Sequence, residues 1–74
     1  MQGVLTVIPG EQTDMTDASE LGAKMVAAGR IQDCRIAGAP RGLSIILLPN
    51  TSDADRLEIG NEFKALGYYI IEMP

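Results

Sequence analysis

Apolar and polar residues alternate in four short segments of the chain, and two longer segments between them repeat apolar residues at helical spacing. The strand-like segments are 4–9, 31–37, 43–48 and 68–73, and glycine or proline bounds each of them. The helical segments span about residues 16–28 and 52–66. Alternation with a period of two is typical of strands, whereas spacings of three and four residues are typical of helices. The pattern predicts the order β-α-β-β-α-β within a single domain, residues 1–74.

This order of elements resembles the ferredoxin-like split β-α-β plan, in which two helices cover one face of a four-stranded sheet. Right-handed crossovers place the first and third strands at the centre of such a sheet. The segments 4–9 and 43–48 are the two most apolar strands, which agrees with a central position. The weak alternation of 31–37 leaves one alternative, a three-stranded parallel sheet of order β-α-β-α-β. The fold class is α/β (α+β) in either version, and such folds support many unrelated functions.

The predicted strands carry apolar residues on both faces. In 43–48, Ile46 and Leu48 point away from the side on which Leu43, Ile45 and Leu47 lie. Two helices can cover only one face of the sheet, so the other face should expose an apolar patch. Patches of this kind are typical of interfaces. We therefore expect a homodimer, with Ile46 and Leu48 among its contact residues.

The second helical segment has a predicted buried stripe of Ile59, Phe63 and Leu66, and Ser52 is placed to cap its start. Leu57 lies about 160° from Ile59 on the helical wheel, so we expect it to be partly exposed and available to a partner.

The same segment carries an acidic stripe. Asp55, Glu58 and Glu62 fall within an arc of roughly 60°. A solvated helix face is the ordinary interpretation of such a stripe. The alternative is a contact strip for a basic protein, including one that normally handles nucleic acid.

Composition excludes several classes of function. The formal net charge of −4 argues against direct binding of nucleic acid, because that binding needs clustered Lys and Arg side chains. No apolar run is long enough to span a membrane. The first residues lack the basic region of a signal peptide, and Cys34 is the single cysteine, so we expect a reducing, cytoplasmic location.

Candidate catalytic chemistry is sparse. The chain has no histidine, which excludes Ser-His and Cys-His nucleophile pairs and a Cys/His zinc site. It also lacks the glycine-rich motifs that cradle phosphates. The position of Cys34 in the weak alternation of 31–37 favours a small buried apolar side chain over a reactive thiolate. We expect no enzymatic activity, no cofactor and no metal site.

One loop is a candidate ligand site. Glu11 and Asp14 follow the first strand, and Asp17 starts the next helix. Three carboxylates are suitable for a hard cation, although Asp at a helix start also has a structural role. The loop would lie just past the C-terminal end of a central parallel strand, where α/β sheets often bind ligands.

The element order is also similar to that of ACT regulatory domains, which bind small molecules. Those domains have an acidic residue followed by Pro-Gly-Leu at the entry to the first helix. Here Pro9-Gly10 matches, but Ile8 precedes the pair, Glu11 follows it and the next loop is longer. Heavy-metal-transport domains share the same order, but the Cys-x-x-Cys that they require is absent.

These observations favour a non-enzymatic protein–protein interaction module. A small acidic protein of this kind is similar to the inhibitors and adaptors encoded by phages and mobile elements, whose targets include basic host proteins. The alternative is a regulatory domain that binds a small molecule, as the ACT-like order implies. An enzyme subunit that uses carboxylates alone is the least favoured reading.

Overall fold

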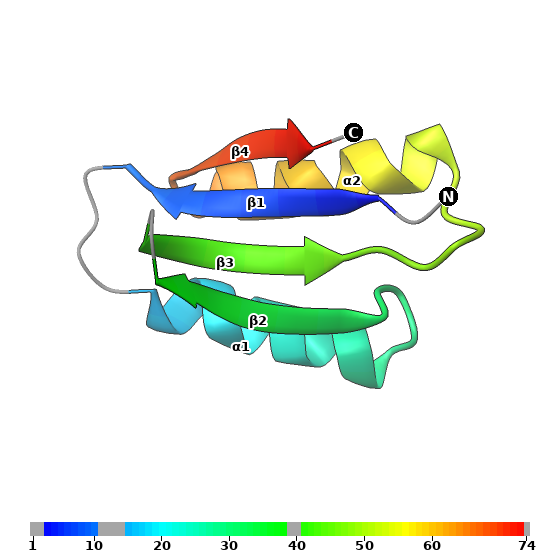
Figure 1. The fold of residues 1–74 in the computed structure, drawn as a ribbon, viewed down its shortest axis with the longest axis horizontal. Helices are drawn as coiled ribbons and strands as arrows, with labels where there is room; N and C mark the ends of the chain where they lie inside the picture. The colour runs from blue at the N-terminus through cyan, green and yellow to red at the C-terminus, as the bar shows by residue number, and fades with distance from the viewer. Residues whose placement is uncertain (1–2, 11–14, 39–40, 74) are drawn as a thin grey trace.

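The computed structural model describes residues 3–10, 15–38 and 41–73. It confirms the predicted order of elements (Figure 1). The weakly predicted segment 31–37 does form a strand, which excludes the three-stranded alternative. The elements are β1 (Val4–Pro9), α1 (Thr16–Ala27), β2 (Asp33–Gly38), β3 (Arg41–Ile46), α2 (Asp53–Ala65) and β4 (Tyr68–Met73).

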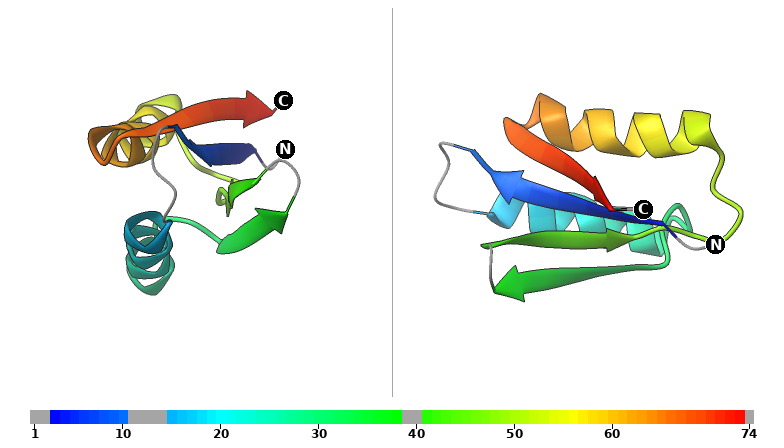
Figure 2. Two further views of the ribbon diagram at one scale, coloured as in Figure 1. Left: turned by 90° about the vertical axis from the view of Figure 1, so that its left-hand side faces the viewer. Right: turned by 45° about the horizontal axis from the view of Figure 1, so that its top comes forward.

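The four strands form one sheet of order β2-β3-β1-β4. β1 and β3 are central, as the split β-α-β plan requires. Every neighbouring pair is antiparallel, so the expected central parallel strand before the first loop is wrong. The reason is that each crossover through a helix skips one position in the sheet, and an antiparallel strand fills the gap. Figure 2 shows α1 and α2 on the same side of the sheet, with the opposite face uncovered.

The core lies between the helices and one face of the sheet. The inward positions of the central strands are almost completely buried, and α1 contributes Met25 while α2 contributes Ile59 and Phe63. Period-two alternation explains this arrangement, because residues two apart on a strand point to the same face. The inward residues of the central strands are Leu5, Val7, Leu43 and Ile45.

The ends of α2 follow local sequence signals. The Ser52 Oγ accepts a hydrogen bond from the Asp55 backbone N–H at 3.1 Å, which confirms the predicted cap. Gly67, just after the helix, has a φ of 95°, a conformation that glycine adopts with little steric cost.

The burial of α2 differs from the predicted stripe at one end. Ile59 and Phe63 are buried as predicted, but Leu66 is 36% exposed. Leu66 is the C-cap residue, one position beyond the last helical residue, so it lies past the part of α2 that covers the sheet. The third buried residue of α2 is Gly60. Leu57 is 61% exposed, which confirms its predicted position away from the core.

Candidate functional site

The uncovered face of the sheet is the first candidate surface, and we call it the open sheet face. The strand register shows which of its residues lie side by side on neighbouring strands. Val4 pairs with Ile46, and Thr6 pairs with both Ser44 and Ile71. All of its described side chains are half-buried or exposed. Its members on the three apolar strands are Val4, Thr6, Ile8, Ser44, Ile46, Tyr69 and Ile71.

Two aromatic or branched side chains dominate this face on β4. Tyr69 is 64% exposed and Ile71 is 46% exposed, although both lie in a regular strand. The predicted second apolar face is therefore confirmed, and Ile46 belongs to it.

Leu48 does not belong to the open sheet face, so its predicted place beside Ile46 is wrong. β3 ends at Ile46. Leu47 is still buried in the core, but Leu48 lies beyond the last paired residue of β3. Leu48 instead lines a pocket beside Gly29, Arg30 and Ile59, on the helix side of the molecule.

The β2 border of the open sheet face is occupied by charged groups that satisfy one another. Arg35 Nε donates to Asp33 Oδ2 at 2.8 Å, and the Cys34 backbone N–H donates to Asp33 Oδ1 at the same distance. These two hydrogen bonds hold the pKa of Asp33 below its ordinary value. Charged side chains of this kind discourage pairing of an edge strand with another chain.

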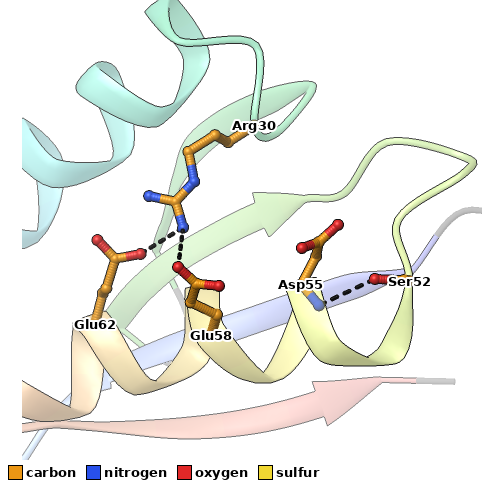
Figure 3. Close-up of polar contacts among 5 residues, drawn as sticks. All are labelled: Arg30, Ser52, Asp55, Glu58 and Glu62. Atoms are coloured by element: carbon orange, nitrogen blue, oxygen red, sulfur yellow. Dashed lines mark hydrogen bonds and ion pairs between the residues drawn. The ribbon is translucent and has the colours of Figure 1, made fainter.

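The acidic stripe of α2 is the second candidate surface, and Figure 3 shows its three carboxylates on one side of the helix. Two of these carboxylates form ion pairs with an arginine. Arg30, just after α1, donates to Glu62 Oε2 at 2.5 Å and lies 3.8 Å from Glu58 Oε1. The hydrogen bond to Glu62 raises the pKa of Arg30. Sequence reasoning missed this contact because Arg30 and Glu62 are 32 residues apart and no local motif links them.

Cys34 has the environment of a packed apolar side chain. Its thiol lies against Gly22 of α1, where a Cβ atom would collide with the sulfur. Burial raises the pKa of the thiol, and the nearby Asp33 carboxylate adds to the rise. A thiol in this state is a weak nucleophile at neutral pH.

The contact between Gly22 and Cys34 leads to a prediction about stability. Gly22→Ala should lower the free energy of unfolding by about 1–2 kcal/mol, because overpacking outweighs the better helix propensity of alanine. In a Cys34→Ala background the same change should be neutral or stabilising by up to about 1 kcal/mol. Urea unfolding of the four proteins at one protein concentration measures this coupling. Equal effects of Gly22→Ala in both backgrounds would contradict the contact.

The remaining predicted ligand residues, Glu11 and Asp14, lie outside the described residues. Within residues 3–10, 15–38 and 41–73, no group of three or more Cys, Asp or Glu side chains is placed to hold a metal ion. Neither described helix is long and apolar enough to cross a membrane.

Comparison with protein-family models, curated proteins and solved structures found no match to this chain.

Proposed function

We propose that this protein is a non-enzymatic protein–protein interaction module that forms a homodimer through the open sheet face. The observation that carries the proposal is an apolar sheet face with no helix over it. Tyr69 and Ile71 are large, and they remain in water in the single chain. Bringing two such faces together removes this apolar surface from water, which is the main favourable contribution to association.

The distribution of charge favours a second copy as the occupant of this face. Six of the ten acidic residues lie on α1 and α2, on the other side of the sheet. The described charges at the sheet face are Asp33 and Arg35, which pair with each other. Two copies of a chain with a formal charge of −4 can therefore meet here with their helical carboxylates directed outward. Those six residues are Asp17, Glu20, Asp53, Asp55, Glu58 and Glu62.

The size of the face sets the expected strength. Four strands of six residues span about 19 Å by about 20 Å, which is a footprint of about 400 Å² per copy before side-chain relief is counted. Two fully overlapping faces cover about 800 Å² of flat area, and the relief of their side chains has to raise the buried surface to about 1,000 Å², the size of a specific interface. We expect a dissociation constant in the micromolar range.

Sedimentation equilibrium over a wide concentration range tests the proposal. We expect a reversible monomer–dimer equilibrium whose weight-average mass reaches that of two chains near the highest concentrations. A compact monomer at about 500 µM, some hundredfold above a low-micromolar dissociation constant, would overturn it.

A cytoplasmic location and the absence of catalysis are parts of the same proposal. The chain has no histidine, and its lone thiol has a raised pKa. A reducing compartment keeps that single cysteine free. An inhibitor or adaptor role would follow from what binds the remaining surface, which is the helix layer.

A further inference from the structure

Two pockets lie along the helix layer, on the side of the sheet opposite the open sheet face. α1 and α2 stand apart there (Figure 2). One pocket of about 320 Å³ lies between the end of α1 and the start of α2, where Arg30 and Glu58 are among its lining residues. A second pocket of about 400 Å³ lies between Asp17 at the start of α1 and Leu66 at the end of α2. We call these two pockets together the helix groove.

The helix groove is acidic along its length. Its lining contains five carboxylates and two cations, Lys24 and Arg30, which leave a formal charge of −3. The groups are at or near the surface, where they attract an opposite charge at the range of the Debye length, about 8 Å at physiological salt. The five carboxylates belong to Asp17, Glu20, Asp55, Glu58 and Glu62.

Apolar side chains lie among these carboxylates. Leu48 and Ile59 line the first pocket, and Leu21 and Leu66 line the second. Leu66 is the residue that the core leaves partly exposed. A ligand that fits both pockets must therefore combine apolar groups with positive charge beside them.

Arg30 shows how the groove binds a cation. Its guanidinium already contacts two carboxylates of α2, Glu58 and Glu62 (Figure 3). Glu58 and Glu62 are four residues apart, a spacing of about 6 Å along a helix axis. Arg or Lys side chains four residues apart on a partner helix have the same spacing.

We propose that the helix groove binds a basic amphipathic helix of a protein partner. Its Arg and Lys side chains pair with the groove carboxylates, and its apolar stripe contacts Leu21, Leu66 and Leu48. The row from Asp55 to Leu66 is about 16 Å long, which corresponds to about 11 residues of partner helix. This inference goes beyond self-association and does not depend on it, because the two surfaces lie on opposite sides of the sheet.

The probe is a synthetic amphipathic peptide of about 15 residues, long enough to form a helix, with Leu at i, i+3, i+4 and i+7 and Arg or Lys elsewhere. A matched peptide carries Glu in place of each Arg and Lys. Titration calorimetry at low and at physiological salt should show binding of the basic peptide that weakens with salt, and no binding of the acidic one. Failure of the basic peptide to bind at either salt concentration would overturn the proposal.

Three variants separate the groove from general attraction to an acidic protein. Asp55→Asn combined with Glu58→Gln should weaken binding at least tenfold. Asp53→Asn, on the same helix but outside the groove lining, should change it less than twofold. Arg30→Gln should strengthen binding about fivefold, since it removes a competing cation that lies 2.5 Å from the Glu62 carboxylate and 3.8 Å from the Glu58 carboxylate. Equal losses for the Asp53 and Asp55/Glu58 variants, or weaker binding after Arg30→Gln, would contradict a site in the groove.

The dimer and the groove are tested apart by one further protein. Ile71→Glu, designed to remove self-association, should bind the basic peptide as tightly as the wild type does. Loss of peptide binding in that variant would place the peptide on the open sheet face and overturn the groove assignment.

Discussion

Replacing Ile71 with glutamate is expected to give a folded monomer at concentrations where the wild type is a dimer. Ile71 is 46% exposed on the outer side of β4, so the glutamate can remain hydrated in the single chain. In the dimer it would be buried in an apolar interface without a partner, at a cost of about 2 kcal/mol for each copy. Because a twofold interface contains the substitution twice, the dissociation constant should rise roughly a thousandfold.

The chain contains a matched control for this substitution. Ile36 is another strand isoleucine, 80% exposed, but it lies on the helix-facing side of β2, opposite Leu43. Ile36→Glu should leave the dimer unchanged. Ile46→Glu, on a central strand of the open sheet face, should act like Ile71→Glu if the chain stays folded. Light scattering during gel filtration, with circular dichroism of each protein, measures the outcome. An Ile71→Glu protein that dimerises as tightly as the wild type would contradict the proposed interface.

Phe63→Ala is expected to unfold the protein or nearly so. The Phe63 side chain is completely buried between α2 and the sheet, and removal of a buried aromatic ring costs about 3–5 kcal/mol. A single core in a chain of this size rarely provides more than about 3–5 kcal/mol in total. Phe63→Leu keeps most of the side-chain volume, so this variant should remain folded. Its free energy of unfolding should fall by about 1–1.5 kcal/mol.

Leu57→Ala is the control for this prediction. Leu57 lies on the same helix but is mostly exposed, and leucine and alanine have similar helix propensities. We expect the free energy of unfolding to change by less than about 0.5 kcal/mol, as is usual for substitutions at exposed positions. Thermal unfolding of the Phe63→Leu and Leu57→Ala proteins at one concentration provides the comparison. A larger loss from Leu57→Ala than from Phe63→Leu would mean that the phase of α2 is wrong.

Local patterns predicted the elements of this fold and the faces of its strands. The alternation in 43–48 correctly placed Ile45 and Ile46 on opposite faces of the sheet, because successive side chains of a strand point to opposite faces. The rule still held at Leu47, which is buried one residue past the end of β3, but it failed at Leu48. It is the end of an element, rather than its type, that residue patterns leave open. Leu66 was misplaced for the same reason, since it caps α2 instead of continuing its buried face.

The candidate surfaces were predicted less completely than the fold. The open sheet face could be predicted from the number of elements, because two helices cannot cover both faces of a four-stranded sheet. The helix groove did not, since its lining comes from both helices and from the loops at Gly29–Arg30 and Asn50–Thr51. The contact of Arg30 with Glu62 changes the acidic stripe from three free carboxylates to a partly neutralised row. Only the fold, which places α1 and α2 on the same face of the sheet, brings these residues together.

Isotope-filtered nuclear Overhauser spectroscopy tests the central claim, that the open sheet face joins two copies, most directly. An equimolar mixture of ¹³C-labelled and unlabelled protein reports only contacts between chains. The account predicts intermolecular signals among methyl and aromatic protons of Val4, Ile46, Tyr69 and Ile71. Intermolecular signals from α1 or α2 in their place, or none at concentrations where the mass is that of two chains, would contradict it.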